Sequence, residues 1–399
     1  MIKREQYIKK IRPFINTDVV KVLTGIRRCG KSVMLELIQR ELLEQGVSES
    51  QILCLNFEDL ANVDLCDAMK LNRWVMEKAK DISGRVYLFL DEVQEVKEWE
   101  RAVNSLRVAL DADIYVTGSN AKLLSGELAT YLAGRYVQFT IYPFSYREFL
   151  LSQNTGDSPQ MFQRYILRGG MPFLLNLAYQ PDVSKQYLKD IYSSVMLKDI
   201  IQRNRLRDAD LLERILLYIL GGIGNIVSAS SITKYLKSEN RKASNDTVLS
   251  YLNACTSAYL FCKIPRWDLQ GKRLLSVNEK YYAADVGIRE AVYGNNMRDI
   301  NQVLENIVCL ELLSRNYKVM IGKAGEYEVD FVAEKDGKRI YIQVTYLLAG
   351  EETIRREFGV YNHVRDNHPK YVLSMDELDF SREGIRHENI RHFLLREDW

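Results

Sequence analysis

The sequence predicts an α/β protein whose first domain contains a parallel β-sheet with helices on both faces. Apolar runs recur at residues 19–24, 51–57 and 85–90, and helix-forming stretches follow the first two. The first run ends at a glycine-rich loop, and the third run ends at two acidic residues. Because a parallel connection requires a crossover, short apolar strands that alternate with helices are typical of parallel sheets.

The glycine-rich loop covers residues 25–32 and has the pattern G-x-x-x-x-G-K-S of a phosphate-binding loop. Its glycines allow backbone N–H groups to face an anion, and the following helix adds its dipole. Lys31 is predicted to reach the β- and γ-phosphates, and the Ser32 hydroxyl to ligate Mg²⁺. A chance glycine loop is the alternative, which the flanking strand and helix disfavour. The predicted nucleotide-binding residues of this segment are Gly25, Ile26, Arg27, Arg28, Cys29, Gly30, Lys31, Ser32 and Val33.

Two acidic residues, Asp91 and Glu92, follow the apolar run at 85–90. A buried parallel strand would deliver Asp91 to the sheet edge beside the phosphate loop, where it joins Ser32 as the predicted metal-binding pair. Glu92 is predicted to polarise the attacking water as a general base. The pattern therefore predicts hydrolysis as well as nucleotide binding.

Two further groups of polar residues accompany predicted strands. The strand at residues 113–120 ends in Ser119 and Asn120, which we expect to contact the γ-phosphate and the water; a simple turn is the alternative. Arg135 precedes a fifth strand that ends near Pro143, and we expect it on the same sheet edge as the phosphate chemistry. There it would act as an arginine finger, in cis or toward a neighbouring subunit; a surface arginine that caps a turn is the alternative.

Five motifs together resemble bacterial and archaeal AAA-type ATPases that carry a C-terminal domain of unknown function. They are Gly-Ile-Arg-Arg-Cys-Gly-Lys-Ser, Leu-Asp-Glu-Val-Gln, Thr-Gly-Ser-Asn, Leu-Ala-Gly-Arg-Tyr and Tyr-Pro-Phe-Ser-Tyr-Arg-Glu-Phe. The resemblance extends over nearly the full length and implies ATP rather than GTP, in agreement with the missing guanine-binding N-K-x-D pattern. It also implies that the helical stretch at 145–208 forms a lid over the nucleotide.

Residues 209–299 are predicted to form a winged-helix domain, with three helices followed by a β-hairpin. The third helix, about residues 244–259, would enter the major groove of DNA. Because its exposed face has little positive charge, a protein contact or regulation of the ATPase is the alternative. Basic residues that could hold phosphates surround this element: Lys234, Lys237, Arg241, Lys242, Lys272 and Arg273.

Residues 300–399 are predicted to be a small α/β domain that resembles the restriction-endonuclease-like fold, whose signature is PD-(D/E)xK. Asp330, with Glu305 or Glu328, would supply the carboxylates of that signature. The E-x-K part is replaced by residues 343–345, Gln-Val-Thr, which lack the charges that hold Mg²⁺ and assist water. We therefore expect a docking domain for nucleic acid or protein without a working nuclease site.

Composition limits the remaining possibilities. The net charge of +2 excludes a globally polybasic chain, so any basic surface must be local. The six cysteines contain no C-x-x-C pair, which favours reduced thiols in a cytoplasmic protein, and no apolar run approaches the ~20 residues of a membrane helix. An opening helix, about residues 3–12, buries Ile8 and Ile11, and its basic residues, Arg4 among them, are expected on a solvated face.

The sequence thus predicts four parts: an AAA-type ATPase core (1–144), a helical lid (145–208), a winged helix (209–299) and a nuclease-like domain (300–399). The predicted function is binding and hydrolysis of ATP with Mg²⁺, which controls a module that docks double-stranded DNA or a protein. A homo-oligomer is compatible with an arginine finger in trans. The alternatives are a nucleotide-gated DNA-binding or interaction protein with little turnover, and an ATP-gated metal-dependent nuclease.

Overall fold

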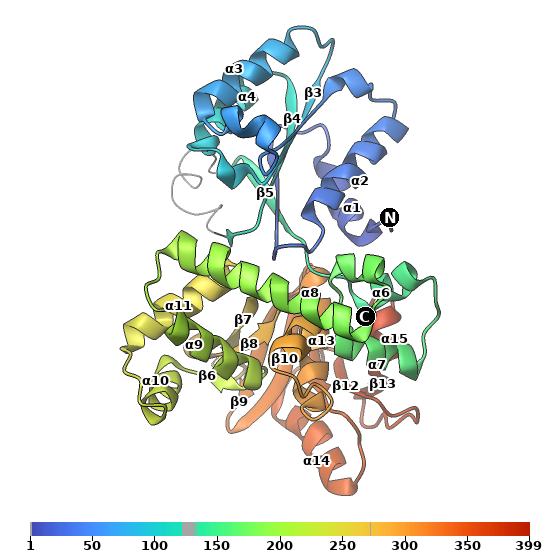
Figure 1. Ribbon diagram of the computed structural model, residues 1–399. Coiled ribbons are helices and arrows are strands. Elements are labelled where there is room, and N and C mark those ends of the chain that lie inside the picture. Colours follow the sequence, from blue (N-terminus) through green and yellow to red (C-terminus); the bar gives the residue numbers. More distant parts are fainter. Residues whose placement is uncertain (1, 122–131, 133, 272) are drawn as a thin grey trace. The chain divides into compact units, whose positions relative to one another are not determined.

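The computed structural model describes residues 2–121, 132, 134–271 and 273–399. The chain divides into two compact units (Figure 1). Unit 1 comprises Met1–Ile141 with Ser257–Tyr259, and unit 2 comprises Tyr142–Thr256 with Leu260–Trp399. The first boundary lies three residues before the predicted end of the ATPase core.

Unit 1 contains a five-stranded parallel sheet with the strand order β2-β3-β4-β1-β5. The strands are β1 (Val20–Thr24), β2 (Ile52–Asn56), β3 (Val86–Asp91), β4 (Ala112–Gly118) and β5 (Tyr136–Thr140). The three central strands β1, β3 and β4 are buried along their whole length. This burial explains their near-continuous apolar sequences, and it confirms the predicted α/β fold class.

Helices cover both faces of this sheet. Figure 1 shows α1 (Glu5–Ile11) and α2 (Lys31–Glu44) on one side, and α3 (Ala68–Ala79) and α4 (Trp99–Ala109) on the other. Helix α3 begins where Asp67 accepts hydrogen bonds from the backbone N–H groups of Met69 and Lys70. The core on the α3–α4 side contains apolar residues of strands and helices, including Val22, Leu88, Val116, Leu71, Val75, Val103 and Leu106.

Unit 2 contains an eight-stranded mixed sheet with the order β13-β12-β11-β10-β9-β7-β8-β6. Its strands are β6 (Ile226–Val227), β7 (Phe261–Asp268), β8 (Arg273–Ala283), β9 (Lys318–Ala324), β10 (Tyr327–Lys335), β11 (Lys338–Val344), β12 (Lys370–Ser374) and β13 (Arg386–Asn389). Strands β9, β10 and β11 are antiparallel, whereas β11, β12 and β13 are parallel. Residues 300–399 contribute the five strands from β9 to β13, in agreement with the α/β character predicted for them.

The pairing of β7 with β9 joins two of the predicted modules. Arg266, Trp267 and Asp268 pair in parallel with Ile321, Gly322 and Lys323. A hairpin edge exposes unpaired backbone groups, and here the strand that follows helix α13 (Ile300–Ser314) satisfies them. The expected boundary at residue 299 thus lies between strands of one continuous sheet, and the three modules predicted after residue 144 share unit 2.

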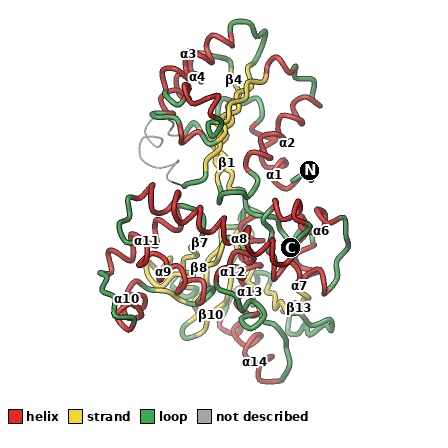
Figure 2. Tube along the Cα trace, viewed as in Figure 1, coloured by secondary structure: helices red, strands yellow, loops and turns green. Residues whose placement is uncertain are grey.

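Helices surround the second sheet (Figure 2). The stretch predicted to be a lid forms α6 (Tyr146–Gln153), α7 (Pro159–Arg168) and α8 (Pro181–Ser194), which continues as a π-helix over Val195–Gln202. The predicted winged-helix elements are α9 (Ala209–Gly221), α10 (Ala229–Ser238) and α11 (Asn245–Ser257), followed by the hairpin β7–β8. The remaining helices are α12 (Val286–Val292), α13, α14 (Glu351–Gly359) and α15 (Ile390–Leu395).

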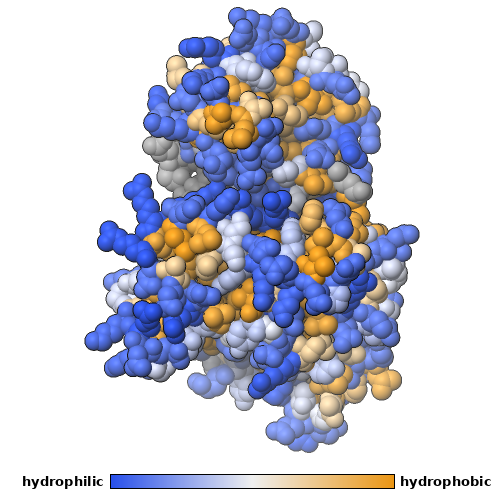
Figure 3. All heavy atoms as spheres, in the orientation of Figure 1, coloured by the Kyte–Doolittle hydropathy of each residue, from blue (hydrophilic) through white to orange (hydrophobic). Residues whose placement is uncertain are grey.

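The face drawn in Figure 3 is mostly hydrophilic, with smaller apolar areas. Exposed apolar side chains include Leu60 on unit 1 and Leu378 on unit 2, at 83% and 73% exposure. Within the described ranges, no helix has the length and apolar character needed to cross a bilayer.

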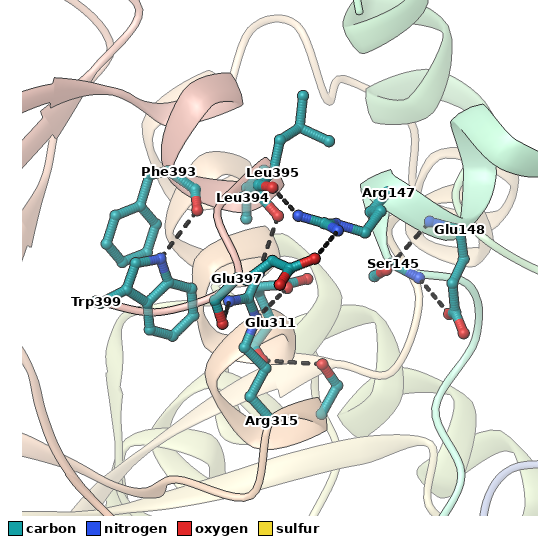
Figure 4. Close-up of polar contacts among 11 residues, drawn as sticks. Ser145, Arg147, Glu148, Glu311, Arg315, Phe393, Leu394, Leu395, Glu397 and Trp399 are labelled. Atoms are coloured by element: carbon teal, nitrogen blue, oxygen red, sulfur yellow. Dashed lines mark hydrogen bonds and ion pairs between the residues drawn. The ribbon is translucent and has the colours of Figure 1, made fainter. Parts of the chain in front are cut away.

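The C-terminal segment is held by two arginines (Figure 4). Arg147 on α6 donates to the carbonyl of Leu395, and Arg315 donates to the carbonyl of Leu394 at 3.0 Å. Trp399 stacks on Phe393 with ring centroids 4.3 Å apart. Cations stabilise the carboxyl end of a helix, so these arginines anchor α15. Arg147 belongs to the Tyr-Pro-Phe-Ser-Tyr-Arg-Glu-Phe motif, and its contact here stabilises the fold of unit 2.

Candidate nucleotide-binding site

The predicted site residues follow three strands that end at one edge of the unit 1 sheet. In parallel register, Thr24 of β1 lies beside Gly118 of β4, and Leu90 of β3 lies beside Val116 of β4. Strand β4, which Ser119 and Asn120 follow, therefore separates β1 from β3. The carboxyl edge of such a sheet is where ligands of open α/β proteins bind.

The phosphate loop requires glycine at both ends. Gly25 has a φ of 145°, and a Cβ atom there would lie 2.2 Å from the carbonyl oxygen of Ile141. Gly30 has a φ of 97° and immediately precedes the first residue of α2, Lys31. The first N–H groups of α2 have no partner within the helix and point toward the loop, which makes this a suitable site for an anion.

Lys31 is buried within the loop. Its Nζ atom donates to the carbonyl oxygens of Gly25 and Ile26 at 3.3 and 3.4 Å. The same atom lies 3.5 Å from Oε1 of Glu92. The ammonium group therefore links the loop to the acidic end of β3.

The two predicted metal ligands lie side by side. The Ser32 hydroxyl hydrogen-bonds the Asp91 carboxyl group, and Thr117 Oγ1 donates to Asp91 Oδ1 at 2.5 Å. Burial raises the pKa of Asp91, while both hydrogen bonds oppose that shift. A hydroxyl and a carboxylate from the loop and β3 are oxygen ligands of the kind Mg²⁺ prefers, so these residues fit the ion.

Glu92 is held in an unusual backbone conformation. It has a φ of 52°, in the left-handed region that is unfavourable for a non-glycine residue. Its N–H donates to Thr117 Oγ1 at 2.8 Å, and Gln94 donates to its carboxylate. The residue is 7% exposed. The strand end, Thr117 and Gln94 thus aim this carboxylate, and neither supporting residue was predicted from the sequence.

Ser119 and Asn120 follow β4 directly and are buried, at 0% and 4% exposure. The structure therefore brings both residues to the edge that carries the phosphate loop and Asp91. Their burial is not that of a surface turn, and their contact with the γ-phosphate and the water stays a prediction.

The expected position of Arg135 is wrong. Strand β5 runs parallel to β1, with Tyr136 beside Val20 and Thr140 beside Thr24. Arg135 precedes Tyr136, and its carbonyl accepts a hydrogen bond from Val20 N at 2.9 Å. It lies at the amino edge of the sheet, opposite the phosphate loop, because it begins a parallel strand rather than ending one. An arginine finger in cis is excluded by this geometry, and a role toward a neighbouring subunit stays a prediction.

Arg4 does not lie on the solvated face that was predicted for it. Instead of facing solvent it is 2% exposed, and its guanidinium donates to the carbonyl of Cys29 at 3.2 Å. The guanidinium carbon also lies 4.5 Å from the ring centroid of Tyr7. The spacing of Arg4 from Ile8 and Ile11 puts all three residues on one helix face, and this spacing could have predicted that Arg4 is buried. Arg4 therefore fixes a carbonyl of the phosphate loop.

A second polar cluster lies in unit 2, at the predicted nuclease-like positions. Lys280 of β8 contacts Glu305 of α13 at 3.0 Å and Glu328 of β10 at 2.7 Å. Asp330 accepts a hydrogen bond from Val344 N at 2.8 Å, and its own N–H donates to the Gln343 side chain. Burial, with the neighbouring Glu305 charge, raises the pKa of Asp330 well above its usual range.

No local sequence pattern predicts Lys280 in this cluster, because the residue comes from the preceding module. In the part of the chain that the structure describes, no three His, Cys, Asp or Glu side chains are grouped to hold a metal ion. The ammonium group of Lys280 instead compensates the charge of the two glutamates.

Comparisons with known proteins agree with this geometry. Residues 17–150 match the model of an AAA domain, and residues 159–299 match a domain of unknown function. An uncharacterized protein of Haemophilus influenzae is 37% identical over 378 residues, which cover 94% of this chain and 93% of that protein. An uncharacterized protein of Methanocaldococcus jannaschii is 28% identical over 404 residues, covering 95% and 88% of the two chains.

Among solved structures, a Walker-type ATPase of Pyrococcus abyssi is similar, with a TM-score of 0.50 and 15% identity. The similar region covers 73% of this chain and 95% of that one. At this identity the similarity supports the fold alone.

Proposed function

The chain belongs to the same family as the Haemophilus influenzae protein and contains an AAA domain, and we propose that it binds ATP with Mg²⁺ and hydrolyses it. One observation carries the proposal: the phosphate loop, the Asp91–Glu92 pair and the Ser119–Asn120 pair meet at one sheet edge. An AAA domain is a phosphate-loop ATPase domain, so the match of residues 17–150 to this domain also supports ATPase activity.

The phosphate loop and α2 would bind the nucleotide. Backbone N–H groups of residues 27–33 and the Lys31 ammonium supply positive potential to the β- and γ-phosphates. Ser32 and Asp91 would hold Mg²⁺, which neutralises charge on the phosphates when bound. Ser119 and Asn120, one strand away, are proposed to contact the γ-phosphate.

Glu92 is proposed as the general base. Its carboxylate is buried and is held by Gln94 while Thr117 holds its backbone, so it is oriented before substrate binds. Thr117 also bonds Asp91, so one side chain positions both acids. Because Thr117 holds both residues, the position of Glu92, the proposed general base, is fixed relative to Asp91, the proposed metal ligand.

The function of hydrolysis is proposed to be control of unit 2, which docks DNA or a protein. One of the chain crossings between the units supports this coupling. Ile141 donates to the carbonyl of Thr24 at 2.7 Å, and its own carbonyl blocks any side chain at Gly25. Three residues later, Phe144 donates to the carbonyl of Gly170 at 2.7 Å. A shift of the phosphate loop would therefore be transmitted along a segment that is held at both ends.

Phosphate release by the purified full chain, with Mg²⁺ and ATP, tests this function. Turnover that requires both Lys31 and Glu92 is expected, and ATP binding without turnover would favour the nucleotide-gated binding protein. Adding duplex DNA distinguishes the ATPase from the nucleotide-gated binding protein further, because an ATPase coupled to DNA changes its rate of phosphate release when DNA is present. The third candidate, an ATP-gated nuclease, requires DNA cleavage, which the Lys280 cluster opposes.

A further inference from the structure

Two neighbouring cavities lie on unit 2, around the first residues of β11. One has a volume of about 630 Å³ and is lined by two residues that follow β7, Leu269 and Gln270, by Arg339 and Tyr341 of β11, and by residues 363–366 and 368. The other has a volume of about 370 Å³ and is lined mainly by the turn between β10 and β11. Arg339 and His368 line both cavities. We call the combined surface the β11 groove.

The β11 groove is basic. Its cationic lining residues are Lys318, Lys335, Lys338, Arg339 and Arg365, against the three carboxylates of Glu334, Asp336 and Asp366. Two of these carboxylates have partners already. Glu334 accepts from Arg339 Nε at 2.7 Å, and Asp366 accepts from the Tyr341 hydroxyl at 2.5 Å while Lys370 lies 3.9 Å away. Four cations then face the single remaining carboxylate of Asp336, so the groove attracts anions.

Aromatic rings lie in the groove and beside its cations. Tyr327, which is 51% exposed, stacks on His363 with ring centroids 4.0 Å apart and planes at 15°. The ammonium of Lys335 lies 5.4 Å from the Tyr317 ring, and that of Lys370 lies 5.8 Å from the Tyr341 ring. Basic grooves with exposed rings are typical of proteins that bind single-stranded nucleic acid, because each base can stack on a ring.

The helix expected to enter a DNA major groove lacks this character. Helix α11 has the sequence NDTVLSYLNACTS, which contains an aspartate and no lysine or arginine. Strand β7, half of the predicted wing, is paired with β9. Neutralising phosphates is the main source of nucleic-acid affinity, and α11 offers no cation for it.

We propose that the β11 groove binds single-stranded nucleic acid. Phosphates contact Lys338, Lys335 and Arg365, and a base stacks on the Tyr327–His363 pair. The larger cavity lies within the about 300–1,000 Å³ of clefts that enclose ligands of nucleotide size, which suits an unpaired strand better than a duplex. This inference names the partner of unit 2 and rests for its purpose on the proposed ATP-dependent function, although the binding itself requires no nucleotide.

Fluorescence anisotropy of the full chain with labelled oligothymidylate of about 16 nucleotides tests the proposal. The double variant Lys338→Glu/Arg365→Glu is expected to weaken binding at least about tenfold at about 200 mM salt. Removing two cations should also make the slope of log affinity against log salt shallower by about 1.4. The matched variant Lys234→Glu/Lys237→Glu makes the same charge change on two exposed lysines of α10 and tests the phosphate-binding site predicted for the winged helix. If nucleic acid binds in the β11 groove instead, its affinity for this variant is expected to stay within about twofold of the parent's.

Tyr327→Ala separates stacking from charge. It is expected to weaken binding by about 1–3 kcal/mol, or about 5- to 150-fold, while the salt slope stays that of the parent. Thermal unfolding of each variant shows whether the fold is intact, and all the substituted residues are exposed.

Several outcomes would overturn the proposal. Equal losses in the α10 control would move the site to the winged-helix elements, and tighter binding of a matched duplex would identify double-stranded DNA as the ligand. Equally strong competition by polyglutamate would identify an acidic polypeptide, and no binding of oligothymidylate would remove the site. ATP binding is measured on the same samples. If a groove variant binds both oligothymidylate and ATP like the parent, the groove proposal is refuted and the proposed ATP-binding function is not.

Discussion

Nζ of Lys31 and Oε1 of Glu92 lie 3.5 Å apart, so the lysine proposed to bind phosphate is paired with the proposed general base. Both residues are almost fully buried, at 4% and 7% exposure. If the ammonium group moves to phosphate oxygens when ATP binds, Glu92 is expected to lose this contact and to accept a hydrogen bond from water instead. Nucleotide binding and base activation are thereby expected to be coupled through one ion pair.

Lys31→Ala is expected to abolish measurable ATP binding, because the triphosphate loses its main cationic side chain in the loop. Equilibrium titration with a fluorescent ATP analogue measures this. Lys70→Ala, which removes an exposed lysine of α3, is the control and should bind like the parent. Parent-like affinity in a folded Lys31→Ala protein would refute the loop assignment.

Glu92→Gln is expected to bind ATP normally and to hydrolyse it about 10²–10⁴-fold more slowly, since the amide cannot accept the proton of water. Phosphate release under saturating ATP measures the effect. Glu77→Gln on the exposed side of α3 provides the matched change and should turn over at the parental rate. If Glu92→Gln is as active as the parent, the base lies elsewhere.

Arg4→Met is expected to weaken ATP binding about tenfold or more, because a hydrogen bond from a charged group to the Cys29 carbonyl is worth about 1.5–3 kcal/mol. Arg4→Lys should recover part of the affinity by restoring charge without the planar fork. Lys3→Met removes one positive charge from a lysine whose side chain is 56% exposed. Comparison with this variant separates the loss of the Cys29 contact from a general effect of charge on ATP binding. A folded Arg4→Met protein with parental affinity would make Arg4 a packing residue only.

Asp285 is expected to make unit 2 more stable as pH falls from 7 toward 5. Burial raises the pKa of this carboxyl from 3.8 to about 6, against hydrogen bonds from the N–H groups of Gly170, Ile288 and Gly287. A raised acid pKa means that the folded state binds the proton more tightly, so stability declines as pH rises through the window between these values. The difference reaches about 3 kcal/mol once the pH has fallen below 3.8, and about half of it is expected by pH 5.

The measurement is the free energy of unfolding of the parent and of Asp285→Asn across that pH range. The parent should gain stability relative to the variant as the pH is lowered. A constant difference would show that Asp285 has an ordinary pKa in the folded protein.

The full chain is expected to leave supercoiled, linear and single-stranded DNA intact with Mg²⁺ or Mn²⁺, with or without ATP. Lys280 pairs with Glu305 and Glu328, and Gln343 adds no charge, so a divalent ion has little to bind. Gel electrophoresis after incubation measures cleavage. Nicking by the parent that disappears in Asp330→Ala would make this cluster a nuclease centre.

The sequence by itself determined the strands of unit 1, the phosphate loop and the acidic pair after β3. These features depend on local properties: apolar strands buried on both faces, glycines with positive φ, and polar residues directly after a strand. Because parallel strands end at a common edge, such local patterns predicted that Lys31, Asp91 and Asn120 would be neighbours.

The tertiary structure decided which residues meet across long sequence distances. Lys21 lies in an apolar strand and forms a buried ion pair with Asp113, and Lys280 pairs with residues of the following module. Arg135 lies at the opposite edge from the phosphate loop because its strand starts there. Strand pairing is selected by the packing of the whole sheet, so the partner of a buried charge depends on contacts that no local pattern contains.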